Sequence, residues 1–236
     1  MPMTSALSTA VNVFASPGEA FRALRERPTI LFPWVLICLG TAAVNWLYVS
    51  EVDLGWLTEQ QLRAQTFIEL TDAQIEDMVN AAAEGSRGGA IAQGVLGSFL
   101  VITLFMLIQA LYLKIVSAFR KDGVRYKQWF SVVAWSSLPA LLTSVATIIF
   151  IMTSDVRFVA QTGINPLSFA NLLQLDLSEA GTAMSIMLSL SPINLWSLIL
   201  VVLGYRTVSD SGFGSSVAVV LGPVVVVAAI VLAVIL

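Results

Sequence analysis

The sequence of 236 residues contains no histidine and a single cysteine, Cys38. These two absences exclude a zinc site built from His and Cys, a histidine acting as general base and an intramolecular disulfide. Charged residues are also scarce, at 11%, whereas a soluble domain has about 25%. The formal net charge of −3 leaves no basic field that could hold nucleic acid. Hydrophobic residues make up 57% of the chain, which excludes a disordered protein and predicts a membrane protein.

The few charged residues leave five long apolar stretches between them. A transmembrane helix needs about 20 apolar residues to cross roughly 30 Å of hydrocarbon. The fold class predicted is therefore all-α: a single domain, residues 1–236, forming a polytopic integral membrane helical bundle. The five spans are expected at about 31–50, 90–113, 128–153, 183–205 and 214–236.

The distribution of basic residues predicts the orientation. With the N-terminus in the cytoplasm and the C-terminus outside, three basic residues lie outside: Arg63, Arg87 and Arg157. The other nine then lie inside: Arg22, Arg25, Arg27, Lys114, Arg120, Lys121, Arg125, Lys127 and Arg206. This imbalance follows the positive-inside rule.

The segments between the spans also carry helix signals. Residues 16–27, with Ser16 as N-cap, predict a short helix with an apolar face. This helix either lies on the cytoplasmic leaflet or simply leads into the first span. In the outer loop 51–88, capping boxes at Thr58 and Thr71 predict helices at about 58–68 and 72–84. In the second outer loop, 154–182, the Asn-Pro pair predicts a break followed by a short apolar turn.

The predicted spans offer no catalytic, cofactor-binding or metal-binding residues, because they contain no ionisable pair at membrane depth. They do contain stripes of small residues, which allow close helix packing within the chain or between copies of it. Pro139, Pro192 and Pro223 are expected to interrupt three of the spans. Such breaks are either kinks satisfied within the bundle or parts of a ligand site.

The chain also resembles the bacterial members of the Yip family, named for Ypt/Rab-interacting proteins. The matching stretches are VFASPGEAFRALRERPTILFPWVL at 13–36, YKQWFSVVAWSSLPALL at 126–142 and SPINLWSLILVVLGYRTVS at 191–209. Within them, the candidate interaction positions are Phe14, Pro17, Phe21, Pro33, Trp129, Phe130, Ser136, Pro139, Pro192, Asn194, Trp196 and Gly204. The resemblance implies a five-span membrane protein without catalytic activity, located in the bacterial inner membrane. Eukaryotic relatives bind Rab-type GTPases through a long acidic N-terminal region, whereas the segment before the first span is basic here.

Two functions of different classes are compatible with the sequence. The first is a non-catalytic scaffold that organises protein partners or lipids, with no cofactor. A protein partner would dock on a composite cytoplasmic surface made of Phe14, Phe21, Trp129 and the basic loop of Arg120, Lys121, Arg125 and Lys127. Membrane lipids and a second copy of the chain are further candidate partners, and nucleic acid is not. The alternative is a small permease or channel for a neutral solute, lined by Asn45, Gln93, Gln109, Ser136, Ser189 and Asn194.

Overall fold

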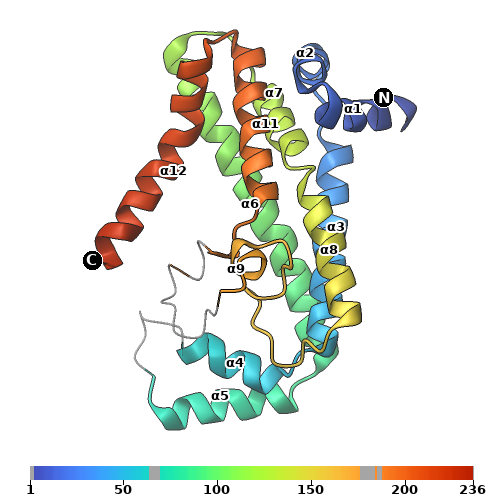
Figure 1. Cartoon of the computed structure of the whole chain (residues 1–236), viewed down its shortest axis with the longest axis vertical. Helices are drawn as coiled ribbons and strands as arrows, with labels where there is room; N and C mark the ends of the chain where they lie inside the picture. The colour runs from blue at the N-terminus through green and yellow to red at the C-terminus, as the bar shows by residue number, and fades with distance from the viewer. Residues whose placement is uncertain (1–2, 64–69, 176–183, 185–187, 236) are drawn as a thin grey trace. The chain divides into compact units, whose positions relative to one another are not determined.

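The structure is a computed structural model that describes residues 3–63, 70–175, 184 and 188–235. It confirms the all-α prediction, because the described residues form helices and no strand (Figure 1). The helices are α1 (Met3–Ala15), α2 (Pro17–Glu26), α3 (Leu31–Glu51), α4 (Leu54–Arg63), α5 (Asp72–Glu84), α6 (Arg87–Arg120), α7 (Tyr126–Ser136), α8 (Ala140–Thr153), α9 (Phe169–Leu172), α11 (Pro192–Ser209) and α12 (Phe213–Ile235).

Four helical segments of the described chain are long and apolar enough to cross a membrane. They are Leu31–Glu51, Arg87–Arg120, Tyr126–Thr153 and Pro192–Ser209. The first three coincide with predicted spans, and α6 is longer than predicted. Its 34 residues reach about 51 Å at a rise of about 1.5 Å per residue, so α6 exceeds the hydrocarbon thickness.

The last two predicted spans are only partly matched. The fourth was expected from residue 183, but α11 begins at Pro192, and residues 183 and 185–187 lie outside the described part. Residues 188 and 189 are helical and residues 190 and 191 are not, so the helical segment is interrupted just before Pro192, the first residue of α11. Pro223 does lie inside α12, as predicted. α12 has 23 residues, long enough for a span, but it is not among the helices identified as able to cross a membrane, so the fifth crossing stays a prediction.

The third span contains the predicted bend at Pro139. Residues 137–139 form a turn between α7 and α8. The N–H of Leu138 donates to the carbonyl of Trp135 at 3.3 Å, and the N–H of Ala140 donates to the carbonyl of Ser137 at 3.0 Å. Both bonds join residues three positions apart, as in a 3₁₀ turn. They satisfy carbonyls around Pro139, whose ring nitrogen carries no hydrogen to donate. The backbone at the bend is therefore satisfied within the chain.

The outer loop contains the helix predicted at 72–84, which is α5. Thr71 caps it, since its side chain accepts from the N–H of Gln74 at 3.3 Å, while Gln74 accepts from the N–H of Thr71 at 2.9 Å. The prediction for the other helix was wrong at its start, because α4 begins at Leu54 and not at 58. Asp53 is its cap, with Oδ1 accepting from the N–H of Trp56 at 2.9 Å. The predicted end, residues 64–68, lies outside the described residues. In the second outer loop, Ser168 caps the short helix α9 after the Asn-Pro pair, as expected.

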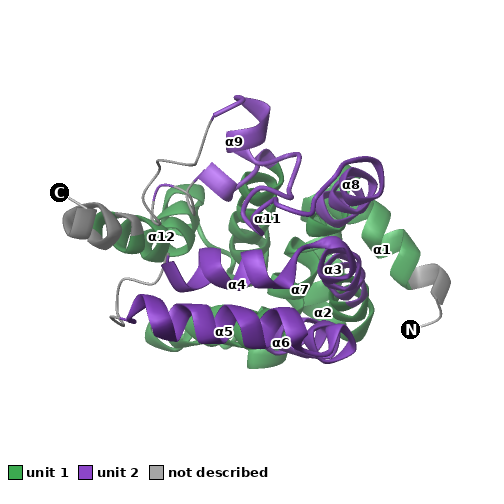
Figure 2. Cartoon of the chain, turned by 90° about the horizontal axis from the view of Figure 1, so that it is seen from below, with its two compact units in different colours: residues 1–38, 101–141, 193–236 green, residues 39–100, 142–192 purple. Residues whose placement is uncertain are grey.

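The chain divides into two compact units (Figure 2). Unit 1 comprises residues 1–38, 101–141 and 193–236, and unit 2 comprises residues 39–100 and 142–192. The core of unit 1 contains the fully buried side chains of Phe21, Trp129, Trp135 and Tyr205. The core of unit 2 is smaller and centres on Tyr48 and residues around it. In lipid, burial against protein replaces contact with acyl chains, so packing quality and hydrogen bonds stabilise these cores more than the hydrophobic effect does.

The N-terminal segment contains one predicted helix and one that was missed. α2 confirms the helix at 16–27, and Ser16 occupies its N-cap position without a side-chain cap bond. Ala20, Phe21 and Leu24 are all buried in the core of unit 1. Of the two alternatives for this helix, lying on the leaflet by its apolar face is wrong, because protein covers that face. α1 was not predicted, since residues 1–18 lack the charge pattern that marks an amphipathic helix.

Candidate functional site

The candidate interaction positions that the structure brings together lie where α2, α7 and α11 pack within unit 1. Gly204 is the centre of this contact. A Cβ atom built on Gly204 would lie 2.6 Å from Cγ1 of Val132 and 3.1 Å from Cε1 of Phe21. The rings of Trp129 and Tyr205 stack beside them with centroids 5.1 Å apart. We call these residues, Phe21, Trp129, Val132, Gly204 and Tyr205, the Gly204 cluster. Only glycine at position 204 allows the three helices to approach this closely.

The connection between α2 and α3 is fixed on α7 by hydrogen bonds. The carbonyl of Thr29 accepts from Oγ of Ser131 at 2.8 Å and from Nε1 of Trp135 at 2.9 Å. The indole of Trp135 also stacks on Phe32, with centroids 5.9 Å apart. These contacts hold the start of α3 and the end of α2 against one helix.

Polar side chains surround the Gly204 cluster at the basic end of unit 1. Nη1 of Arg25 donates to the carbonyl of Thr207 at 3.4 Å, in the last turn of α11. A cation there interacts favourably with the helix dipole. Nη1 of Arg120 donates to Oγ of Ser215 at 2.7 Å and lies 3.3 Å from the hydroxyl of Tyr205. The side-chain amide of Gln128 donates to the carbonyl of Arg25 at 2.6 Å. α2, α6, α7 and α11 are thereby tied together at one end of the unit.

The basic loop at 120–127 has a defined conformation. Gly123 has a φ of 75° and Lys121 a φ of 57°, so the chain reverses through the left-handed region. The carboxylate of Asp122 accepts from the hydroxyl of Ser117 and from the N–H of Val124. Nζ of Lys114 donates to the carbonyl of Val124 at 2.7 Å. The turn is therefore held by bonds on both of its sides.

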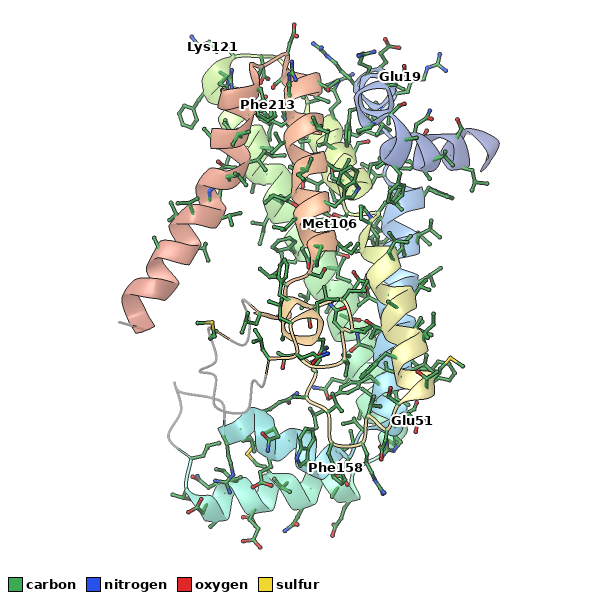
Figure 3. The ribbon with its side chains drawn as sticks, in the orientation of Figure 1. Glu19, Glu51, Met106, Lys121, Phe158 and Phe213 are labelled. Atoms are coloured by element: carbon green, nitrogen blue, oxygen red, sulfur yellow. The ribbon has the colours of Figure 1, made fainter. Side chains whose placement is uncertain are left out.

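The outward side chains of this loop carry unpaired positive charge. Lys121, Arg125 and Lys127 are exposed, and within the described part of the chain none of them forms an ion pair. Lys121 and Glu19 both lie at the same end of unit 1 (Figure 3). A rigid turn that displays free cations can bind an anionic partner with little ordering cost.

Unit 2 contains a polar cavity of about 420 Å³. It is lined by Ser50, Glu51, Val52, Asp53, Arg87, Ser154, Asp155, Val156 and Arg157. Nη1 of Arg87 donates to the carbonyls of Val49 and Ser50, at 2.7 and 2.8 Å, and of Val52 at 3.1 Å. Arg87 thus satisfies carbonyls at the C-terminal end of α3 that have no partner in the helix.

Two of the three carboxylates that line this cavity have local structural roles. Asp53 caps α4, and Oδ1 of Asp155 accepts from the N–H of Arg157 at 3.1 Å. Among the described residues, no group of three acidic or cysteine side chains is arranged to hold a metal ion. The hydrogen bonds of Arg87, Asp53 and Asp155 at this cavity join the ends of neighbouring helices and loops.

One ion pair on the outer surface of unit 2 affects a titratable group. Nε of Arg63 lies 2.9 Å from Oε1 of Glu59, and both side chains are well exposed. Hydrogen bonding and the negative charge of Glu59 raise the pKa of the Arg63 guanidinium above its ordinary value. Arginine is always protonated at physiological pH, so this shift changes no charge there.

The remaining candidate positions lie outside the Gly204 cluster. Pro17 is the first residue of α2, and Pro33 and Pro139 are buried. Phe130 is half-buried and stacks on Tyr126, with ring centroids 6.2 Å apart. The hydroxyl of Ser136 is buried and has no hydrogen-bond partner among the described residues.

Four other candidates are exposed. They are Phe14 on α1 and, at the start of α11, Pro192, Asn194 and Trp196. The predicted composite docking surface is therefore incorrect in two of its members. Phe21 and Trp129 are fully buried, because the absence of a side chain at Gly204 lets α11 cover both. Phe14 and the basic loop remain available at the surface.

The residues proposed to line a permease are divided between the two units. Gln109, Ser136 and Asn194 belong to unit 1, and Asn45, Gln93 and Ser189 belong to unit 2. Gln93 and Asn194 are exposed, and the amide of Asn45 donates to the carbonyl of Thr41 on its own helix. The structure gives no observation in favour of a pore lined by this set.

Sequence reasoning missed several residues that organise these contacts. Tyr205 follows Gly204 directly, and Val132 is one helical turn after Trp129, so both were accessible as neighbours of named positions. Thr29 and Arg87 carried no such signal, because their acceptor and donor roles depend on segments distant in the sequence.

The long apolar helices and the basic helix ends define a polytopic, all-α integral membrane protein. The Yip1 domain matches residues 11–235, nearly the whole chain, and the protein belongs to the Yip1 domain family. This confirms the resemblance inferred from the sequence. The family is a non-catalytic family of membrane trafficking proteins, so the protein is not an enzyme. No curated protein and no solved structure gives a significant match to the chain.

Proposed function

We propose that this Yip1-domain protein is a scaffold of the bacterial inner membrane that organises protein partners or lipids at its cytoplasmic face. The observation that carries the proposal is the separation of charge between the two units. Unit 1 holds nine of the 12 basic residues and four of the 15 acidic ones, a net charge of +5. Unit 2 holds the rest, a net charge of −8. Under the positive-inside rule, the basic end of unit 1 is cytoplasmic and the α4–α5 segment is outside.

The basic loop is the proposed contact surface for an anionic partner. Lys121, Arg125 and Lys127 are exposed and unpaired within the described structure, and the loop that carries them is held by Asp122 and Lys114. The Gly204 cluster also supports the proposal, because its packing fixes α7, the helix at which the basic loop ends. In this view the buried cluster positions the surface and the loop makes the contact. Five spans, with α12 as the last, complete the proposed topology.

The proposal is tested by site-specific photocrosslinking in cells. A photoreactive residue at Lys127 is expected to give discrete crosslinked products, and the same residue at Glu76, exposed on α5, is the control for the outer side. The variant Lys121→Gln with Arg125→Gln should lose the Lys127 products, whereas Lys121→Arg with Arg125→Lys should keep them.

Two results would contradict the scaffold function. One is that Lys127 gives no product above the Glu76 control. The other is that the products persist unchanged after both charges are removed, since a contact made by the basic loop depends on them.

A further inference from the structure

α1 has one face packed against the protein and one face uncovered. Ala6, Thr9 and Val13 lie on the packed face and are buried. The opposite face carries Leu7, Val11 and Phe14, with exposed fractions of 57%, 63% and 41%. The spacing of these three residues, four and then three positions apart, places them in one stripe along the helix. We call them the α1 stripe.

The two N-terminal helices differ in what they leave exposed. α2 buries all of its larger apolar side chains and exposes Arg22 and Arg25. α1 contains no charged residue, and the polar residues of its sequence MTSALSTAVNVFA are Ser, Thr and Asn. Its apolar part, Ala6–Ala15, is too short to cross a membrane. An apolar helix of that length is typical of a core helix or of one lying in the membrane interface.

The position of α1 favours the membrane interface. Figure 1 shows α1 lying across the direction of α11, with both in unit 1. Leu31, the first residue of α3, is also largely exposed, so the apolar surface that the first span presents to lipid begins at this end of the unit. The arginines of α2 lie on the neighbouring helix, where they can meet phosphate groups. Leu31 and the α1 stripe are therefore both exposed apolar surface of unit 1, the kind of surface that acyl chains cover in a membrane protein.

We propose that α1 lies in the membrane leaflet at the basic end of unit 1, with the α1 stripe inserted among the lipid acyl chains. Because α1 carries no charge, its own binding comes from apolar insertion and not from anionic headgroups. Helices of this kind respond to lipid packing, since loosely packed or curved leaflets open more space for bulky side chains. The inference requires only the membrane location of the chain and no protein partner, so it stands or falls separately from the scaffold function.

The test uses the purified full chain in liposomes of phosphatidylethanolamine and phosphatidylglycerol, with an environment-sensitive fluorophore on single cysteines. In a Cys38→Ser background, the fluorophore in the Val11→Cys variant is expected to be quenched by lipids spin-labelled at shallow acyl positions. It should resist iodide present on both sides of the membrane. The matched control is Glu19→Cys on α2, an exposed polar position, where iodide should quench and the spin-labelled lipid should not.

Two further measurements separate insertion from its alternatives. Quenching by lipid at position 11 should persist when phosphatidylglycerol is replaced by phosphatidylcholine, because α1 has no charge to lose. In the Leu7→Ser, Phe14→Ser background, the fluorophore at position 11 should no longer be quenched by spin-labelled lipid and should instead be quenched by iodide. The thermal unfolding temperature should stay close to that of the parent, because both side chains are exposed. Iodide quenching of the parent at position 11 to the same extent as at position 19 would overturn the proposal. Protection from both quenchers would also overturn it, because a second copy of the chain would then cover the stripe.

Discussion

Replacing Gly204 with alanine tests the packing that holds α2 and α7 on α11. The added methyl group would lie 2.6 Å from Cγ1 of Val132 and 3.1 Å from the ring of Phe21. Val132 is β-branched and lies in a helix, so its side chain cannot rotate away freely. Overpacking of this kind costs about 1–3 kcal/mol, whereas alanine gains about 1 kcal/mol over glycine in helix propensity. Because the clash is with two side chains at once, the overpacking cost should lie toward its upper end, and we expect a net loss of about 1–2 kcal/mol.

The assay is reversible unfolding in mixed micelles, followed by circular dichroism over a titration with sodium dodecyl sulfate. The matched control is Gly97→Ala in α6, where no atom lies within 4 Å of the added methyl group, and it should be neutral or slightly stabilising. Adding Val132→Ala to Gly204→Ala should make the combined loss smaller than the sum of the two single losses, because it removes the atom that clashes. Equal stability of Gly204→Ala and Gly97→Ala, or strict additivity in the double variant, would refute the reasoning.

Two further predictions compare pairs of similar residues by the same unfolding assay. Trp135 and Trp129 are both fully buried, but only Trp135 donates its indole N–H, to Thr29, among the described residues. Trp135→Phe should therefore cost about 1 kcal/mol more than Trp129→Phe, and equal losses would contradict the hydrogen-bond assignment. Arg87→Gln should cost about 2 kcal/mol, because a charged donor to the end of α3 is lost. Arg157→Gln, at the same cavity and with its guanidinium over the ring of Phe158, should cost less than about 1 kcal/mol.

The first three spans were predictable because a charge-free apolar stretch longer than the bilayer is thick is typical of a transmembrane helix. α1 was not predictable, because its apolar residues alternate with serine and threonine and no charge marks its polar side. Which face of α1 is buried is decided by its contacts with α2 and α7. These contacts cannot be read from the sequence of α1 alone.

The start of α4 and the burial of Trp129 were predicted incorrectly, because both depend on contacts between segments distant in the sequence. Asp53 and Thr58 are both good N-caps, and the N–H of Asp53 also donates to the carbonyl of Arg157 at 3.0 Å, a contact between segments distant in the sequence. Trp129 near the end of a span is typical of an interfacial aromatic residue. Its burial depends on Tyr205 and Gly204, which lie on another helix. Family resemblance named Gly204, but only the structure gives the reason for glycine there.

The orientation of the basic end of unit 1 is the claim on which the proposed function depends most directly. It is measured by labelling single cysteines with a membrane-impermeant maleimide in spheroplasts, in the Cys38→Ser background. The positions are Glu26 at the end of α2 and Asp77 on α5, both exposed. The Asp77→Cys variant should label in intact spheroplasts, and the Glu26→Cys variant only after the membrane is permeabilised. Labelling of the Glu26→Cys variant in intact spheroplasts would place the basic end outside and contradict the account.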